Sequence, residues 1–204
     1  MKKTLLSILS LLITFRVFCQ ETPELLFEKG RSEFMTGNYA LANKHFSEAI
    51  FLKKDYKEAY FYRGNGQHLT GDYKKAIKDY KKIIKMGPPD PSIFFLKANS
   101  ERALKKYRAA KKDYNKAIKL KPDFKEALYF KAFVEFEMKK YKDAEKDFSK
   151  SIELQPVFDE AYYYRGFARY NMGNKMGAIA DWKKVAEIDD FEKAEFIQSV
   201  IDNK

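Results

Sequence analysis

A pattern of small and aromatic residues recurs every 34 residues along almost the whole chain. It is clearest from Lys57 to Asp90, where two short helical patterns are separated by Gly71-Asp72 and followed by Gly87-Pro88-Pro89. A period of this length is typical of proteins that stack one supersecondary unit many times. The chain is therefore predicted to consist of five repeats, each in contact only with its neighbours.

Positions within a repeat, counted from Lys57 as the first, indicate how the two helices pack. The eighth and twentieth positions are always Gly or Ala, because a larger side chain would hold two crossing helices apart. These residues are Gly30, Gly64, Ala98, Ala132 and Gly166, then Ala42, Ala76, Ala110, Ala144 and Ala178. The twenty-fourth position always carries a large ring: Phe46, Tyr80, Tyr114, Phe148 or Trp182. Proline at position 32 of the three middle repeats ends the second helix, since it lacks an N–H group.

This set of spaced residues resembles the tetratricopeptide repeat family over about residues 23–192. The resemblance implies an all-α fold, a right-handed superhelical solenoid of five antiparallel helix pairs. The predicted repeats are 23–56, 57–90, 91–124, 125–158 and 159–192. The spacing of Phe191, Ala194, Phe196 and Ile201 predicts a further helix, so that residues 193–204 form a capping helix and tail that cover the last repeat.

The first 19 residues are predicted to be an export signal of bacterial type. Lys2 and Lys3 precede an apolar stretch over residues 4–15, which is too short to span a bilayer. Cleavage between Cys19 and Gln20 would leave residues 20–22 as a lead-in and place the protein in the periplasm or outside the cell.

Two alternatives remain for this segment. Cys19 could be the lipidated first residue of a lipoprotein, which would anchor the chain peripherally to a membrane surface. The segment could instead be a buried N-terminal helix. No disulfide is expected in either of the cleaved forms, because Cys19 is the one cysteine of the sequence.

Basic residues outnumber acidic ones, 40 to 29, and the excess lies mostly on the predicted second helices of repeats two and three. In the family these helices form the outer, convex side. The basic residues there include Lys74, Lys78, Lys82, Arg108, Lys111, Lys112 and Lys116. They indicate either a solvated face that keeps the protein soluble or a docking surface for acidic proteins, lipid head groups or lipopolysaccharide. Nucleic acid is not expected as a partner of an exported protein.

A basic residue at the seventh position recurs with Asp at the twenty-third. Paired helices would bring these two groups together, which predicts ion pairs within four repeats. The pairs are Arg63–Asp79, Lys97–Asp113, Lys131–Asp147 and Arg165–Asp181. If they are partly exposed, each adds at most about 1 kcal/mol to stability.

The resemblance implies that the first helices line a concave groove, chiefly through the second, fifth, ninth and twelfth positions, and the last three of these carry the predicted contacts. In repeats two to five these are Phe61, Asn65, His68, Phe95, Asn99, Arg102, Tyr129, Phe133, Phe136, Tyr163, Phe167 and Tyr170. Asn65 and Asn99 could hydrogen-bond a peptide backbone while the rings hold its side chains. The alternative is that these residues serve ordinary packing.

No residue pattern indicates catalysis, a metal or a cofactor. The sequence has two His, His45 and His68, in different repeats, and no spacing typical of metal ligands or of a nucleophile with its base. The chain is predicted to be a non-enzymatic adaptor that binds an extended peptide or protein segment and no small-molecule substrate. The alternative functions are an envelope-surface factor that binds anionic partners through its basic face and a subunit of an envelope-anchored complex.

Overall fold

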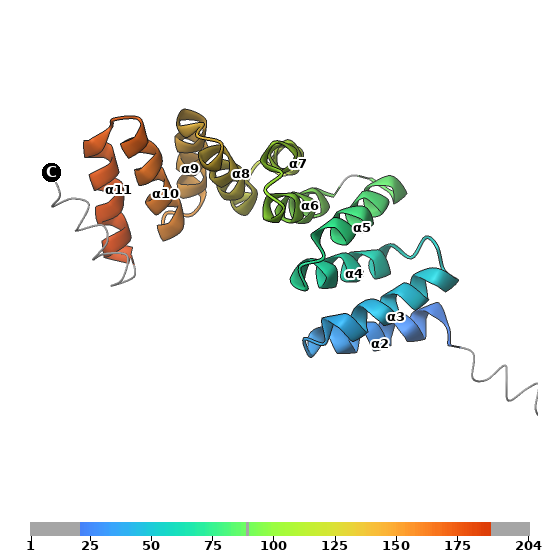
Figure 1. Ribbon diagram of the computed structural model, residues 1–204. Coiled ribbons are helices and arrows are strands. Elements are labelled where there is room, and N and C mark those ends of the chain that lie inside the picture. The colour runs from blue at the N-terminus through green and yellow to red at the C-terminus, as the bar shows by residue number, and fades with distance from the viewer. Residues whose placement is uncertain (1–20, 89, 189–204) are drawn as a thin grey trace, which may run out of the picture. The chain divides into compact units, whose positions relative to one another are not determined.

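The computed structural model describes residues 21–88 and 90–188 (Figure 1). The predicted signal segment with Cys19 and Gln20 and the predicted C-terminal helix lie outside the described residues. Within the described ranges the chain forms ten helices and no strand, so the prediction of an all-α fold is confirmed.

The ten helices alternate between two lengths. The first helices of the repeats have 13 residues each: α2 (Pro23–Met35), α4 (Lys57–Leu69), α6 (Pro91–Ala103), α8 (Lys125–Glu137) and α10 (Asp159–Asn171). The second helices have 14 residues each: α3 (Tyr39–Leu52), α5 (Tyr73–Met86), α7 (Tyr107–Leu120), α9 (Tyr141–Leu154) and α11 (Lys175–Ile188). Equivalent helices begin 34 residues apart, as the period predicts.

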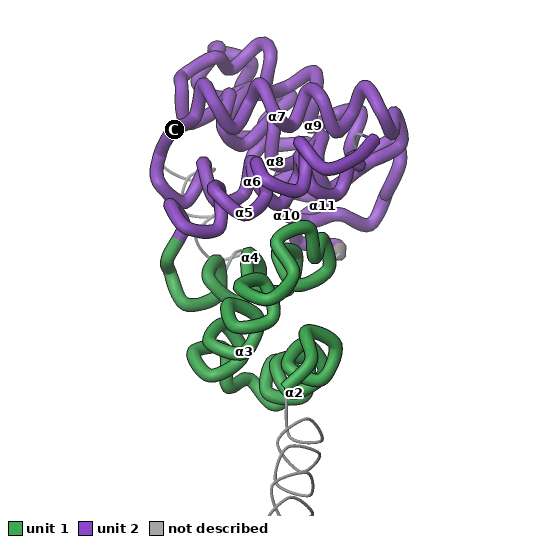
Figure 2. The backbone as a smooth tube through the Cα atoms, turned by 90° about the vertical axis from the view of Figure 1, so that its right-hand side faces the viewer, with its two compact units in different colours: residues 1–72 green, residues 73–204 purple. Residues whose placement is uncertain are grey.

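The chain divides into two compact units, residues 1–72 and 73–204 (Figure 2). In unit 1, α3 packs against both α2 and α4. In unit 2, each helix from α5 to α11 packs against the next one along the chain. The cores of unit 2 therefore form a series between successive helices, as expected of stacked repeats.

Small residues allow the large rings to enter the helix crossings. Ala98 and Ala110 are fully buried around Tyr114 in one core cluster of unit 2. At Gly166, a Cβ atom would lie 2.4 Å from Nε1 of Trp182. In unit 1, the same atom at Gly30 would lie 2.7 Å from the ring of Phe46. A larger side chain at either glycine would clash with a buried ring.

The turn between the two helices of a repeat contains a residue with positive φ. Glycine occupies this position in three repeats, with φ of 82° at Gly37 and Gly71 and 83° at Gly173. Lysine occupies it in the other two, with φ of 55° at Lys105 and 59° at Lys139. A side chain in this left-handed region costs roughly 1–2 kcal/mol. The turn geometry alone would therefore favour glycine at both lysine positions.

Candidate functional site

An aromatic ring on the second helix of one repeat stacks on a ring of the first helix of the next repeat. The ring of Tyr114 stacks on Phe130 at 6.4 Å between centroids, and that of Phe148 on Tyr164 at 6.2 Å. In unit 1, Phe46 stacks on Tyr62 at 5.7 Å. Each pair joins the twenty-fourth position of one repeat to the sixth position of the next. This contact was not predicted, although the sixth position carries a ring in three of the five repeats, at Tyr62, Phe130 and Tyr164.

The fifth-position rings pack more deeply than a groove lining would. Tyr129 is only 8% exposed, and its ring lies 4.7 Å from Phe158 and 5.8 Å from Phe148. Burial raises the pKa of the Tyr129 hydroxyl above its usual range. The ring of Tyr129, predicted to line a peptide site, therefore belongs to the core between repeats and leaves little surface for a ligand. Phe95 is half-buried against Phe124 at 4.9 Å.

Polar residues and rings meet where α6 faces α8. The guanidinium of Arg102 lies over Phe130 at 4.6 Å and over Phe133 at 5.6 Å, within the range of cation–π attraction. The hydroxyl of Tyr114 donates a hydrogen bond of 2.6 Å to Oδ1 of Asn99. This bond fixes the orientation of the Asn99 amide, whose NH2 group can donate to a ligand.

The predicted aromatic cluster consists of two groups of rings. Phe133 and Phe136 both pack on Tyr164, at 5.1 Å and 5.8 Å. Phe167 and Tyr170 both pack on Trp182, at 5.0 Å and 5.9 Å, and Tyr163 lies 4.9 Å from Phe167. Tyr170 is 45% exposed, and the other predicted rings are half-buried. We call Asn99, Arg102, Phe133, Phe136, Phe167 and Tyr170 the ring face of unit 2.

The predicted site residues of repeat two belong to unit 1. Phe61, Asn65 and His68 lie on α4 and are half-buried, and the ring of Phe61 lies 5.4 Å from Tyr62. They are therefore not part of the ring face of unit 2.

The predicted ion pairs of unit 2 are confirmed, but they are buried. Lys97 bonds Asp113 and Lys131 bonds Asp147, while Arg165 donates to both carboxylate oxygens of Asp181, at 2.6 Å and 2.9 Å. The three aspartates are between 2% and 5% exposed. The small contribution expected of partly exposed pairs therefore does not apply here, because both partners lie between packed helices. Removing one partner would leave an uncompensated buried charge.

Charged residues at the eleventh position extend these pairs into the next repeat. Lys111 donates to Glu135 at 2.7 Å, and Arg169 donates to Glu145 at 2.7 Å and to Asp181 at 2.9 Å. These contacts were not predicted, although the eleventh position follows the same period with Glu33, Gln67, Glu101, Glu135 and Arg169. The Lys111–Glu135 and Glu145–Arg169 contacts each join a second helix to the first helix of the following repeat, whereas Arg169 and Asp181 lie in the same repeat.

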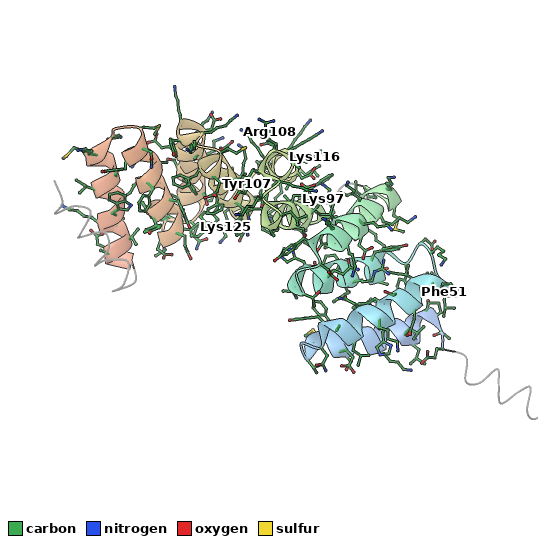
Figure 3. All side chains as sticks on the ribbon, viewed as in Figure 1. Phe51, Lys97, Tyr107, Arg108, Lys116 and Lys125 are labelled. Carbon is green, nitrogen blue, oxygen red and sulfur yellow. The ribbon has the colours of Figure 1, made fainter. Side chains whose placement is uncertain are left out.

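The basic surface of α5 and α7 is smaller than predicted. Lys111 is not part of it, because its ammonium group pairs with buried Glu135 and lies 3.7 Å from Asp143. The other predicted members are exposed: Lys74, Lys78, Lys82, Arg108, Lys112 and Lys116. Figure 3 labels two of them, Arg108 and Lys116, on α7. Lys116 also pairs with Asp113 at 2.9 Å.

Burial makes Glu135 a proton-binding group near neutral pH. The side chain is 1% exposed, and its Oε2 atom accepts no hydrogen bond in the described structure. Burial raises the pKa of Glu135 from 4.5 to about 7, and the negative charge of Asp147 acts in the same direction, whereas Lys111 and Lys131 oppose it. The folded protein therefore retains a proton that the unfolded chain has already lost at pH 6.

We expect this proton to make the stability of unit 2 depend on pH. Because the folded pKa lies above the unfolded one, the contribution of Glu135 is complete below pH 4.5 and is lost as the pH rises to about 7. The slope in this window reaches at most about 1.4 kcal/mol per pH unit. Urea unfolding at several pH values should show a smaller slope for Glu135→Gln than for the wild type. Equal slopes would contradict the assignment.

The part of the chain that the structure describes contains neither a candidate membrane-spanning helix nor a candidate metal site. No helix there is long and apolar enough to cross a membrane. Among the same residues, no group of three or more His, Cys, Asp or Glu side chains could hold a metal ion.

Models of known families match most of the described chain. Residues 24–91 and 160–189 match tetratricopeptide repeat models, and residues 69–151 match a model described as anaphase-promoting complex, cyclosome, subunit 3. No curated protein matches the sequence.

Solved structures of similar fold also cover most of the chain. A crystal structure of MamA protein is 21% identical, covers 82% of this chain and 91% of its own, and superposes with a TM-score of 0.78. MamA from Desulfovibrio magneticus RS-1 is 18% identical, with 83% and 96% covered and a TM-score of 0.79. YrrB, described as a TPR protein with an unusual peptide-binding site, is 18% identical, with 86% and 91% covered and a TM-score of 0.76. At these identities the likeness shows the fold. With the family models and the helix period, it identifies the chain as a protein built of tetratricopeptide repeats.

Proposed function

We propose that this chain is a non-enzymatic scaffold whose ring face in unit 2 binds an extended segment of another protein. Tetratricopeptide repeat proteins bind proteins or peptides, and the description of YrrB refers to a peptide-binding site. The observation that carries the proposal is the juxtaposition of Asn99, Arg102 and Phe133 on neighbouring first helices.

The chemistry of the ring face suits an extended chain. The NH2 group of Asn99 and the guanidinium of Arg102 are donors that peptide carbonyl groups accept. The half-buried rings of Phe133 and Phe136 and the exposed ring of Tyr170 offer apolar surface to its side chains. Aromatic and Arg side chains carry much of the binding energy in protein interfaces. The rings are held in place by Tyr164 and Trp182, so little side-chain conformational entropy would be lost on binding.

Replacing two of these rings should weaken peptide binding. Dodecapeptides selected from a random library on the full chain provide the ligands, and fluorescence anisotropy gives their Kd. We expect Phe136→Ala with Tyr170→Ala to raise Kd at least about tenfold, equivalent to about 1.4 kcal/mol. The loss follows from the removal of two contact surfaces.

The matched control removes apolar side chains from second helices of the same unit. Leu120 on α7 is 43% exposed and Leu154 on α9 is 44% exposed. These exposed fractions are similar to that of Tyr170. Leu120→Ala with Leu154→Ala should change Kd by less than about twofold. Thermal unfolding confirms that both variants are folded. Equal losses in the two variants, or no loss in the ring variant, would refute binding at the ring face.

We also propose that the chain is exported, on the basis of residues 1–19 alone. The mass of the mature protein, isolated after expression of the full chain in a bacterium, tests this. A chain that begins at Gln20 supports cleavage of a signal segment, and a lipid-modified Cys19 supports a membrane anchor. An intact chain in the cytoplasm would refute export.

A further inference from the structure

Two hollows recur at the same place in successive repeats of unit 2. The first, of about 470 Å3, is lined by Lys105, Lys106, Tyr107, Arg108, Ala109 and Met138. The second, of about 440 Å3, is lined by Lys139, Lys140, Tyr141, Lys142, Asp143 and Met172. Five of the six residues have a counterpart of the same or similar kind 34 positions later. The hollows are therefore copies of one feature, on the edge where first helices turn into second helices.

The rims of both hollows are strongly basic. Each rim carries three cations within four residues, and all six are exposed: Lys105, Lys106, Arg108, Lys139, Lys140 and Lys142. Within the described part of the chain, none of the six takes part in an ion pair. Two acids are close: Glu137, which accepts a 3.0 Å hydrogen bond from the Tyr107 hydroxyl, and Asp143 of the second rim. Tyr107 and Arg108, both labelled in Figure 3, are the first two residues of α7.

Lysine at the turn is not explained by the fold. Lys105 and Lys139 hold the left-handed conformation that glycine holds in three other repeats. An outlier of this kind points to a use of the side chain beyond the turn. Lys106 and Lys140 follow them at the helix start and make no side-chain cap. The ammonium groups of both lysines in each turn therefore contribute positive charge to the rim.

The floor of each hollow is apolar and recessed. Tyr107 and Met138 are half-buried in the first, and Tyr141 is half-buried in the second. A recessed floor accepts a side chain that protrudes from a ligand, whereas the head groups of a flat bilayer would meet only the rim. The surface therefore fits a chain that alternates carboxylates with apolar side chains.

The spacing of the hollows sets the spacing of the ligand. The first helices α6 and α8 are in contact, so their axes lie roughly 8–10 Å apart. A chain in the polyproline II conformation covers this distance in about three residues at roughly 3.1 Å each, and with three residues per turn it presents every third side chain to the same face. We propose that this edge, separate from the ring face, docks an acidic protein segment with an apolar residue at about every third position.

A synthetic peptide tests the proposal with the full-length chain. The probe is a labelled dodecapeptide of four Asp-Leu-Glu units, and its Kd is measured by anisotropy. Lys105→Gly with Lys139→Gly should raise Kd at least about tenfold. Because glycine suits the positive φ of both turns, the melting temperature of this variant should be equal or higher. Lost binding therefore could not be attributed to misfolding.

Controls distinguish binding at this surface from non-specific electrostatic attraction and from binding at the ring face. Lys74→Gln with Lys78→Gln removes the same charge from α5 and should change Kd by less than about twofold. Phe136→Ala with Tyr170→Ala should also leave Kd unchanged, so this proposal can fail or hold independently of the proposed function. A peptide of equal composition with its four leucines adjacent should bind at least about fivefold more weakly.

Three outcomes would overturn the proposal. The first is no binding of the Asp-Leu-Glu peptide, and the second is an equal loss of affinity in the α5 control. The third is binding to vesicles of anionic lipid that depends on Lys105 and Lys139 while the peptide does not bind. That result would assign the edge to a membrane surface instead.

Discussion

Replacing Asp181 with alanine should lower the free energy of unfolding of unit 2 by about 3–5 kcal/mol. Asp181 is 2% exposed and accepts hydrogen bonds from two guanidinium groups, those of Arg165 and Arg169. The variant would leave these two cations close together and without their shared carboxylate. Urea unfolding followed by circular dichroism measures the change.

Asp143→Ala serves as the control for this prediction. Asp143 lies on α9, is 56% exposed, and is 3.7 Å from Lys111. Because solvent screens such a pair, its loss should cost less than about 1 kcal/mol. A loss of under about 1 kcal/mol for Asp181→Ala as well would show that the buried cluster contributes little to folding.

Replacing Phe148 with alanine should cost about 3–5 kcal/mol and also weaken binding at the ring face. Phe148 is fully buried and stacks on Tyr164, which in turn supports Phe133 and Phe136. The cavity left behind would release Tyr164 and the two rings that pack on it. Urea unfolding measures the stability, and anisotropy with a selected peptide at a temperature where the variant is folded measures the affinity.

Phe148→Leu separates the two effects. Leucine fills most of the space and should cost less than about 1.5 kcal/mol, with most of the peptide affinity retained. If Phe148→Ala remained folded and bound peptide as tightly as the wild type, the support of Phe133 and Phe136 by the core would not matter for binding.

The 34-residue period was sufficient to predict the helices, because the residues that define it act locally. Pro91 begins α6, and Gly173 provides the positive φ of a turn. The small and large positions also behave as predicted, since Gly166 and Trp182 are complementary in one crossing. Local propensity and packing favour the same conformation at these positions, so the sequence alone predicts their structure.

The candidate site was less predictable, since burial there depends on contacts between repeats. Tyr129 and Phe95 share one repeat position, yet Tyr129 is buried by Phe158 and Phe148 while Phe95 is half-buried. Lys111 follows the pattern of an exposed lysine but pairs with Glu135 of the next repeat. Charged residues are seldom fully buried unless they are paired, and the period alone does not show which charges meet.

Photo-crosslinking from single positions tests the central claim, that the ring face of unit 2 binds an extended protein segment. Benzoylphenylalanine would replace Phe136 or Tyr170 on first helices, and Leu120 or Leu154 on second helices, with a library-selected peptide as ligand. The account predicts crosslinks from positions 136 and 170 and none above background from 120 and 154. Crosslinks that arise mainly from positions 120 and 154 would contradict it.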